Sequence, residues 1–395
     1  MKLNLNALGI VNPLGKGKRE VARNLLGGSQ DGLVWRYDLL PDRAVRAGVV
    51  REVLPPVPER LAYLDCRNNR LALAALLEIH EDVMTIANRV GPRRVAVVMG
   101  TSTSGIAEGE AALAQRIANG SWPRDFRPRA QELGNLAAFV ADVCGLEGPA
   151  YTISTACSSS AKAFASAARL IEVGLCDAAV VGGVDTLCRM TLGGFDSLEA
   201  LSKDRCNPFS RNRDGINVGE GAAIFLMTRE EAPVTLLGVG ESSDAYHVSS
   251  PHPRGDGAVL AMRRALDAAR LKPEEICYVN LHGTATELND LMEAHAVNVI
   301  FGDRTPCSST KSITGHMLGA AGANEAAFLW LMLEPGFADG SMPPHIWDGE
   351  YDPALPRLNF ASLDSSFANH NQVAALSNSF AFGGSNAAVV LGRGW

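Results

Sequence analysis

The stretch Tyr151-Thr-Ile-Ser-Thr-Ala-Cys157-Ser-Ser-Ser-Ala-Lys-Ala-Phe-Ala-Ser-Ala-Ala-Arg-Leu-Ile171 predicts a strand that runs directly into an alanine-rich helix, with Cys157 at the turn between them. Gly174 gives this helix a natural end. A thiol in front of a helix meets unpaired backbone N–H groups and the positive end of the helix dipole, and both favour thiolate over thiol. The same N–H groups can hold the oxyanion that forms when sulfur attacks a carbonyl. We therefore expect Cys157 to be a nucleophile; the alternative is a buried structural cysteine.

The composition is that of a globular protein: of 395 residues, 47% are hydrophobic and 20% are charged. This length suits one large domain or two of ordinary size. The formal net charge of −7 argues against a nucleic-acid partner and against a polybasic membrane patch. No apolar run approaches the roughly 20 residues that span a bilayer, and the N-terminus lacks a signal-peptide core. We expect a cytoplasmic enzyme without a membrane span.

The eight cysteines are scattered among apolar neighbours and include no Cys-x-x-Cys pair. In a reducing compartment most of them should be inert, small hydrophobic side chains. The histidines are scattered too, and no cluster of histidine and cysteine has the spacing of zinc ligands. We expect no bound metal.

Strands and helices are expected to alternate along the chain, which predicts the α/β class. A proline-rich loop over residues 53–60 precedes a helix that is expected to begin near Asp65. Further strands are expected over residues 94–99, 178–182, 222–227 and 275–281.

A weak internal repeat is visible. Residues 152–184 predict a strand, a short loop, a helix of small residues and a strand with Gly-Gly, and residues 307–390 repeat this order as far as the segment Phe382-Gly-Gly-Ser-Asn-Ala-Ala-Val-Val. Both helices are small or apolar all round, which suits helices that are packed on every side. Two similar halves, residues 1–229 and 230–395, would explain the repeat; chance similarity is the alternative.

Three more segments contain side chains that could take part in catalysis. In Tyr278-Val-Asn-Leu-His282-Gly-Thr, a strand ends at a histidine, and strand ends are where α/β folds place functional groups. Lys311 and His316 precede an all-apolar helix that contains Glu325; Glu325 is the expected ion-pair partner of Lys311, because a charge among apolar residues needs one. In the segment Phe382-Gly-Gly, two glycines let the backbone turn sharply, as a mobile gate or as a plain turn between strands.

Taken together, these four segments resemble the β-ketoacyl-acyl-carrier-protein synthases of the elongating type, within the thiolase superfamily. The resemblance runs nearly end to end, from Gly9-Ile-Val-Asn-Pro-Leu-Gly through Pro208-Phe-Ser-Arg-Asn-Arg-Asp-Gly to the final Phe-Gly-Gly-Ser-Asn segment. It implies a thiolase-like five-layer α-β-α-β-α fold from two duplicated halves, working as a homodimer or as a heterodimer with a ketosynthase-like subunit.

The resemblance also implies roles for single residues. Cys157 matches the nucleophile, His282 and His316 match the pair that drives decarboxylation, and Lys311 and Glu325 match the supporting ion pair.

Other residues match the groups that hold the substrate. Phe382 matches the gating phenylalanine, whose N–H shares the oxyanion with the N–H of Cys157, and Thr284 and Thr286 match the threonines that hold a phosphopantetheine arm. That arm would arrive on an acyl carrier protein, so no cofactor of the enzyme's own is expected.

The reaction implied is a decarboxylative Claisen condensation in fatty-acid or polyketide synthesis. An acyl group held on Cys157 would join the two carbons of malonyl-carrier protein to give a β-ketoacyl-carrier protein. The alternative is a chain-length-determining partner subunit of a ketosynthase heterodimer; such subunits normally lack the nucleophilic cysteine, which this chain keeps.

The chain departs from the usual elongation enzymes at several positions. Ser-Ser-Ser follows the nucleophile, Ile216 stands where phenylalanine is usual, and Ala381 replaces a glycine before the gate. Thr103 matches a residue that lines the acyl pocket at the dimer interface, and it is smaller than the branched residue that blocks the pocket in some relatives. The small Thr103 suggests a pocket for a long or rigid acyl chain. The segments Ser154-Thr-Ala-Cys-Ser-Ser-Ser and Gly240-Glu-Ser-Ser-Asp-Ala-Tyr-His resemble the ketosynthases of bacterial aryl-polyene pathways.

Carrier proteins are acidic, so a basic docking patch is expected despite the negative net charge. Arg67 and Arg70 match the family's docking positions and should share one helix face. Two ordinary solvated arginines are the alternative.

Overall fold

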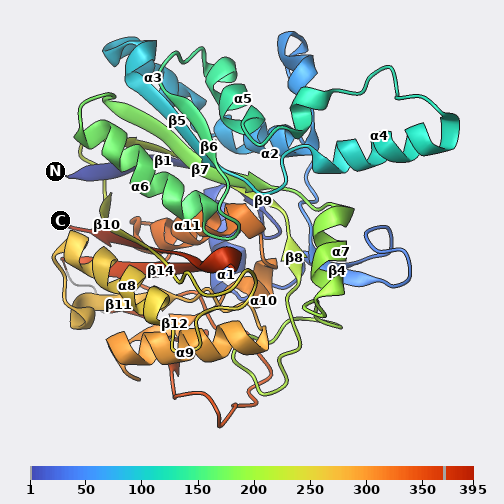
Figure 1. Cartoon of the computed structure of the whole chain (residues 1–395). Coiled ribbons are helices and arrows are strands. Elements are labelled where there is room, and N and C mark those ends of the chain that lie inside the picture. Colours follow the sequence, from blue (N-terminus) through green and yellow to red (C-terminus); the bar gives the residue numbers. More distant parts are fainter. Residues whose placement is uncertain (1, 368–370) are drawn as a thin grey trace.

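The computed structural model describes residues 2–367 and 371–395 (Figure 1). The N-terminal half contributes six strands to a large mixed sheet. Five follow the spatial order β6-β5-β7-β9-β1, and the short β2 (Gly15–Lys16) pairs with β1 alone. Within it β5 runs parallel to β6 and β7, whereas β9 runs antiparallel to β7 and β1. The strands are β1 (Leu3–Asn12), β5 (Val95–Gly100), β6 (Ala150–Ile153), β7 (Ala178–Asp185) and β9 (Gly221–Thr228).

The C-terminal half repeats this order strand for strand, as β12-β11-β14-β15-β10. The two halves meet where β1 pairs with β10, with Leu3 opposite Leu236. Since β10 starts at Val234, the expected division at residues 229 and 230 lies in the connection from β9 to β10. The strands are β10 (Val234–Ser243), β11 (Ile276–Asn280), β12 (Pro306–Ser308), β14 (Val373–Ala381) and β15 (Ser385–Arg393).

The internal repeat therefore has a structural basis, with one correction to its alignment. The counterpart of β7 is β14, which ends at Ala381, because each is followed by an antiparallel neighbour. The segment after Phe382 instead forms β15, the counterpart of β9. The internal repeat in the sequence instead aligns the segment after Phe382 with the Gly-Gly strand, which is β7.

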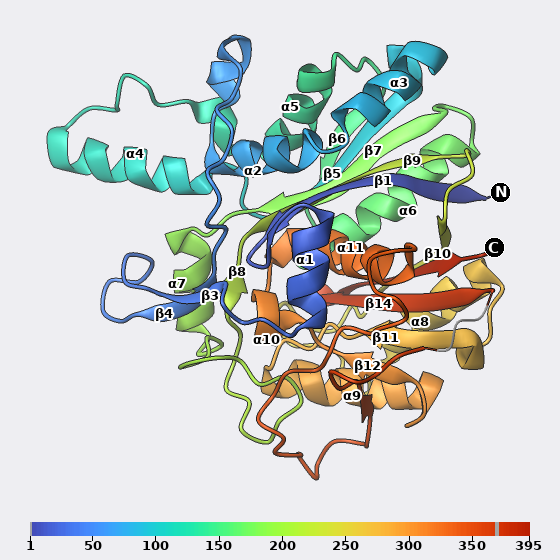
Figure 2. The same cartoon turned by 180° about the vertical axis from the view of Figure 1, so that it is seen from behind.

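Helices fill the space between the halves and cover both outer faces, which gives the five layers (Figures 1 and 2). The central layer is α6 (Ser159–Glu172) and α11 (Ala321–Leu333), and every residue of α11 is buried, as its uniformly small and apolar sequence predicts. The outer helices are α2 (Arg67–Leu76), α3 (His80–Val90) and α5 (Asn135–Cys144) on the N-terminal half, and α8 (Asp256–Ala269) and α9 (Glu287–Phe301) on the C-terminal half.

Smaller elements surround this core. A three-stranded sheet has the order β3-β4-β8, and α4 (Ile106–Asn119) projects from the body of the molecule (Figures 1 and 2). The other elements are β2 (Gly15–Lys16), β3 (Leu33–Arg36), β4 (Val45–Gly48), β8 (Val218–Gly219), β13 (Asn359–Phe360), α1 (Lys18–Leu26), α7 (Arg189–Ser197), α10 (Lys311–Thr314) and the 3-10 turns η1 (Glu59–Leu64), η2 (Pro92–Arg94), η3 (Pro128–Gln131), η4 (Pro273–Glu275), η5 (Leu318–Ala320) and η6 (Phe382–Gly384).

The four strands expected from the sequence are present as β5, β7, β9 and β11. The expected strand, turn and helix around Cys157 are β6 and α6, and Gly174 adopts a left-handed φ of 76° just after the helix. The proline-rich segment differs in part, because Glu59–Leu64 forms a 3-10 turn rather than loop.

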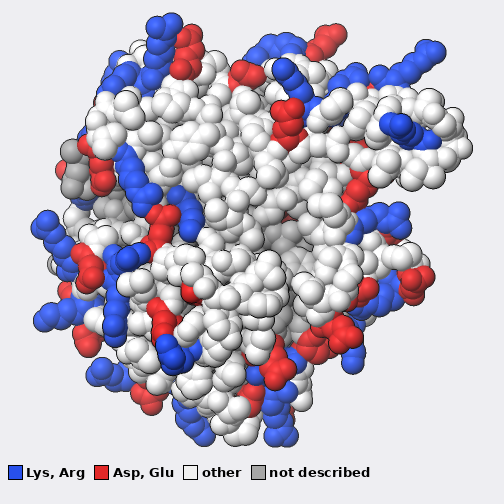
Figure 3. Space-filling model, viewed as in Figure 1, with Lys and Arg blue, Asp and Glu red and all other residues white. Residues whose placement is uncertain are grey.

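No helix in the described part of the chain is both long and apolar enough to cross a bilayer. On the face seen in Figure 3, basic and acidic side chains are interspersed around the edge, and no large patch of one sign stands out.

Candidate active site

Cys157 lies in a tight turn between β6 and α6. Ala156 in front of it has a φ of 51°, a left-handed conformation that costs energy for any residue with a Cβ. The hydroxyl of Ser159 accepts a hydrogen bond from the N–H of Thr155 at 2.9 Å, and the hydroxyl of Ser158 donates to the carbonyl of Thr155, also at 2.9 Å. The serines that follow the nucleophile therefore hold its turn in shape.

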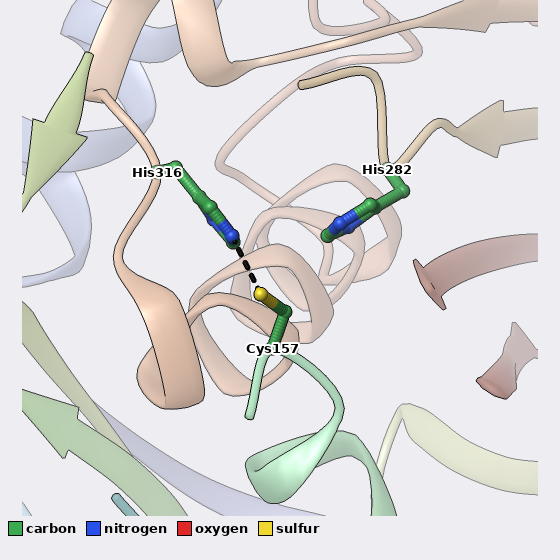
Figure 4. A group of neighbouring side chains, drawn as sticks. All are labelled: Cys157, His282 and His316. Carbon is green, nitrogen blue, oxygen red and sulfur yellow. Dashed lines mark hydrogen bonds between the residues drawn. The ribbon is translucent and has the colours of Figure 1, made fainter. Parts of the chain in front are cut away.

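Two histidines of the C-terminal half face this cysteine. His282 follows β11, and His316 follows α10. The His316 Nε2 atom lies 2.9 Å from the Cys157 sulfur, and the two imidazole rings are 5.2 Å apart between centroids, nearly perpendicular. Figure 4 shows both rings directed at the sulfur from separate segments of chain. The structure thus brings together the three residues that the sequence singled out, although they lie up to 159 positions apart.

The protonation state of Cys157 corrects the expectation of a resting thiolate. Burial raises the pKa of the Cys157 thiol to about 12, although the Lys311 charge and the backbone N–H of Phe382 act in the opposite direction. The carboxylates of Asp185 and Glu325 raise that pKa further. The thiol is therefore protonated at neutral pH, because loss of solvent outweighs the helix terminus. The proton has to leave as sulfur attacks, and the His316 Nε2 atom is in place to take it.

Both histidines are neutral. Burial, followed by the positive charge of Lys311, lowers the pKa of His282 and of His316 well below 6.5; for His282 the second ring adds to the effect. A neutral imidazole can donate one hydrogen bond and accept another. The lowering of the His316 pKa by Lys311 agrees with the expectation that Lys311 helps to keep His316 uncharged.

The expected ion pair between Lys311 and Glu325 is present. The ammonium nitrogen lies 2.5 Å from Glu325 Oε1, and each side chain is only 2% exposed. Burial raises the pKa of Glu325, and Lys311 opposes that effect. Because a buried charge without a partner is costly, each side chain depends on the other to stay ionised.

Cys157, His282 and His316 line one cavity of about 440 Å³ that reaches from the sulfur to the surface. The hydroxyls of Thr284 and Thr286 line it and lie 2.9 Å apart. The Phe382 side chain is 40% exposed at its mouth, with its ring 5.8 Å from that of Phe195. The remaining lining combines apolar side chains, among them Leu198, Ile216 and Phe380, with polar ones such as Arg213 and Asp214.

Thr103 lies outside the lining of this cavity. It is fully buried, and its hydroxyl donates to Asp185 at 2.7 Å. Its place in an acyl pocket at a dimer interface stays a prediction.

Arg67 and Arg70 lie on α2, in a second cavity of about 740 Å³. The Arg67 guanidinium binds both carboxylate oxygens of Glu220, which is 1% exposed, so its charge is neutralised inside the fold. Arg70 is 47% exposed and pairs with Asp65. Docking of a carrier protein at these arginines stays a prediction, and Arg70 is the one that can reorient toward a partner.

Sequence reasoning missed two buried carboxylates on α9. Glu293 accepts the backbone N–H of His282 at 2.7 Å and that of Gly283 at 2.6 Å, which fixes the turn that carries His282. Asp290 accepts the N–H groups of Phe209 and Ala285. The sequence does contain a sign of these two residues. They are acids three positions apart on a helix that directly follows Thr286, and such a pair shares one helix face.

Cys157, His282 and His316 also have the composition of a metal site, with one ligand atom from each lying within 4.8 Å of the others. Two features argue against a resident ion. The Nδ1 atoms of both histidines have no hydrogen-bond partner among the described residues, whereas a metal-binding imidazole normally donates from its second nitrogen. Lys311 also adds a positive charge nearby. The absence of a metal stays a prediction.

The thiolase-like fold and a cysteine facing two histidines define a class of acyl-transferring condensing enzymes. The family described as "Beta-ketoacyl synthase, N-terminal domain" matches residues 59–232, and "Beta-ketoacyl synthase, C-terminal domain" matches residues 234–346. The chain belongs to the β-ketoacyl synthase family, which confirms the resemblance seen in the sequence.

Curated relatives match over nearly the whole chain. A 3-oxoacyl-[acyl-carrier-protein] synthase 2 of Staphylococcus aureus is 30% identical, covering 98% of this chain and 99% of the relative. The enzyme of the same name from Coxiella burnetii is 31% identical, covering 98% of each chain.

Solved structures extend the similarity. A chain in the complex of a ketosynthase (ApeO) with its chain length factor (ApeC) from Xenorhabdus doucetiae is 46% identical, with a TM-score of 0.94 and coverage of 99% of this chain and 98% of the other. The ishigamide ketosynthase/chain length factor is 29% identical, with a TM-score of 0.87 and 99% coverage of both.

Proposed function

We propose that this chain catalyses a decarboxylative Claisen condensation. An acyl group held on Cys157 joins two carbons from malonyl-acyl-carrier protein, and the product is a β-ketoacyl-acyl-carrier protein. The observation that carries this proposal is the single cavity that holds the Cys157 thiol and two neutral imidazoles. Relatives named 3-oxoacyl-[acyl-carrier-protein] synthase 2 support the same acyltransferase chemistry.

The first half-reaction loads the enzyme. The Cys157 sulfur attacks the acyl thioester while its proton passes to His316 Nε2, 2.9 Å away. The N–H groups of Cys157 and Phe382 hold the oxyanion of the tetrahedral intermediate. The pantetheine thiolate then leaves and takes a proton, so that one thioester replaces another.

The second half-reaction extends the chain. Malonyl-carrier protein enters the same cavity and loses carbon dioxide, and the electron pair of the broken bond becomes an enolate. His282 and His316 donate hydrogen bonds to the enolate oxygen from neutral rings with their protons on Nε2. His316 keeps the proton that its Nε2 accepted during loading and loses the proton of Nδ1 instead. The carbanion attacks the acyl group on Cys157, the thiolate leaves and is reprotonated, and the product is two carbons longer.

The substrate arm and the partners follow from this reaction. Thr284 and Thr286 hold the phosphopantetheine arm that the acyl carrier protein delivers, so the enzyme needs no cofactor of its own. The chain acts in the cytoplasm as a homodimer or as a heterodimer with a ketosynthase-like subunit. Exposed apolar side chains along the projecting helix α4, Leu113 at 48% and Ile117 at 77%, support such an assembly, as does the similarity to a ketosynthase bound to its chain length factor.

The acyl group is a long or rigid chain, as in an aryl-polyene pathway. The support is the similarity to the complex of ApeO with ApeC and the aliphatic Ile216 in the cavity wall, where the family usually has the larger phenylalanine. Turnover with saturated and with polyunsaturated acyl-carrier proteins tests this substrate class. A strong preference for saturated chains would refute it.

The runner-up is a chain-length-determining subunit that keeps Cys157 as a relic. A relic cysteine would not need a buried ion pair and two neutral imidazoles around it, so the geometry favours the enzyme. Mass spectrometry after incubation with acyl-carrier protein separates the two. We expect the acyl group on Cys157, no label in Cys157→Ala, and full labelling in Cys277→Ala as the matched control. Absence of acylation from the wild type would favour the subunit.

A further inference from the structure

Asp185 is a buried carboxylate that the proposed chemistry does not use. It is the last residue of β7, its side chain is fully buried, and no Lys or Arg in residues 2–367 and 371–395 forms an ion pair with it. Burial raises its pKa, and hydrogen bonds from neighbouring groups oppose that rise. A buried carboxylate without an ion-pair partner is costly unless hydrogen bonds compensate for the lost solvent. The groups that donate those hydrogen bonds therefore indicate what Asp185 holds in place.

One oxygen of Asp185 holds the loop that follows β5. Oδ1 accepts the hydroxyls of Thr101 at 2.8 Å and Thr103 at 2.7 Å, together with the backbone N–H groups of Ser102 at 2.7 Å and Thr103 at 2.8 Å. The Ser102 hydroxyl donates a hydrogen bond, 3.5 Å long, to the carbonyl of Ala156, the residue in front of the nucleophile. This loop therefore lies against the turn that carries Cys157.

The other oxygen reaches the opposite half of the molecule. Oδ2 accepts the N–H of Ala320, 3.1 Å away, at the end of η5 and four residues after His316. The approach is so close that a Cβ at Gly319 would come within 2.9 Å of this oxygen and 2.6 Å of the Ser102 hydroxyl. One carboxylate thus binds the loop beside Cys157 and the turn beyond His316.

We propose that Asp185 is a positioning residue: it holds the loop after β5, which lies against the Cys157 turn, in register with the turn beyond His316 in the other half. The sulfur and the His316 ring meet across the junction of the halves at 2.9 Å, a distance that small shifts of either turn would change. The role rests on the proposed function, because it matters only if proton transfer between these two groups is part of the reaction.

The test compares Asp185→Asn with Asp177→Asn. Asp177 directly precedes β7, at the end of the strand opposite to Asp185. Its side chain is 38% exposed and pairs with Arg94, so Asp177→Asn should behave like the wild type. Asp185→Asn keeps the shape and removes the charge and one acceptor. We expect kcat for condensation to fall about 10- to 100-fold, with a smaller change in KM, because misplacement of reacting groups by up to about 1 Å has such effects.

A second readout separates positioning from a loss of stability. The charged groups around the Cys157 sulfur are Lys311, Glu325 and Asp185, beside the two neutral histidines. Since the Asp185 charge raises the thiol pKa, its removal should shift the pH profile of Cys157 alkylation by iodoacetamide to lower pH. A lower unfolding temperature without that shift, or a kcat within about twofold of the wild type, would overturn the proposal.

If Asp185→Asn does not fold, Thr101→Val replaces it; this variant removes the hydroxyl that donates to Oδ1 and also accepts the N–H of Ser104. A fall in kcat supports the proposal, and an unchanged kcat contradicts it. The alkylation profile needs no carrier protein. Wild-type protein that is alkylated normally but forms no β-ketoacyl product would therefore contradict the proposed function and not the role of Asp185.

Discussion

Replacement of Lys311 by methionine tests whether the buried cation serves catalysis or only stability. Methionine keeps most of the side-chain length and removes the ammonium group. Glu325 is then left 2% exposed without its partner, and its second oxygen already has none among the described residues. Breaking a buried ion pair in this way costs about 3–5 kcal/mol of unfolding free energy when the remaining charge persists. The cost is smaller if Glu325 takes up a proton, which burial favours.

The catalytic effect has a predictable sign. Lys311 lowers the pKa of both His282 and His316, so its removal must raise them. Each ring has to be neutral to stabilise the enolate, and a ring is protonated below its pKa. The acid limb of kcat/KM for decarboxylation of malonyl-carrier protein should therefore move to higher pH, toward the ordinary histidine value of about 6.5.

The double variant Lys311→Met with Glu325→Gln provides the control. It removes both charges, so it should recover most of the lost stability in urea denaturation, because a neutral buried pair lacks the desolvation penalty. The acid limb should stay displaced, since the cation is still missing. If Lys311→Met leaves the acid limb where it was, or if the double variant restores it, the electrostatic reasoning is wrong.

Three further outcomes are expected. Glu293→Ala leaves the N–H groups of His282 and Gly283 without their acceptor, so it should lower the free energy of unfolding by about 2–4 kcal/mol. The control Glu287→Ala, on the exposed side of the same helix, should change the free energy of unfolding by less than about 0.5 kcal/mol. Equal effects of the two variants would contradict the role of Glu293. Alkylation of Cys157 should still accelerate between pH 8 and 10, since its pKa is about 12, and a plateau near pH 7 would show a resting thiolate instead. Arg70→Glu should weaken acyl transfer from carrier protein and spare small thioester mimics; Arg93→Glu, at an exposed ion pair elsewhere, is the control, and equal losses on both substrates would argue against docking.

Much of the site could be predicted because each group stands where a regular element ends. Cys157 precedes a helix, and His282 follows a strand. Such positions are visible as changes of pattern along the chain. In a duplicated fold these ends gather at one edge, so the segments that look alike in sequence converge on one cavity.

Other features depend on what distant segments bring together. The charge state of Cys157 follows from the burial that both halves impose on it, which a local helix-dipole argument leaves out. The sequence predicts Arg67 as a docking residue or a solvated arginine, and it gives no sign that its carboxylate partner Glu220 lies 153 positions away. Asp185 and Glu293 bind backbone N–H groups, and a sequence pattern does not record which N–H groups lack a partner.

The pairing around β10 has a practical consequence. Leu3 and Arg393 both lie against the first residues of this strand, so the two ends of the chain emerge as neighbours (Figure 1). Strand directions put them at the end of the sheet opposite to Cys157, since β1 runs parallel to β7 and β15 runs back from the gate. An affinity tag or a fused domain at either terminus would start far from the entrance to the cavity. A short linker between the termini would permit circular permutation with the reaction centre untouched.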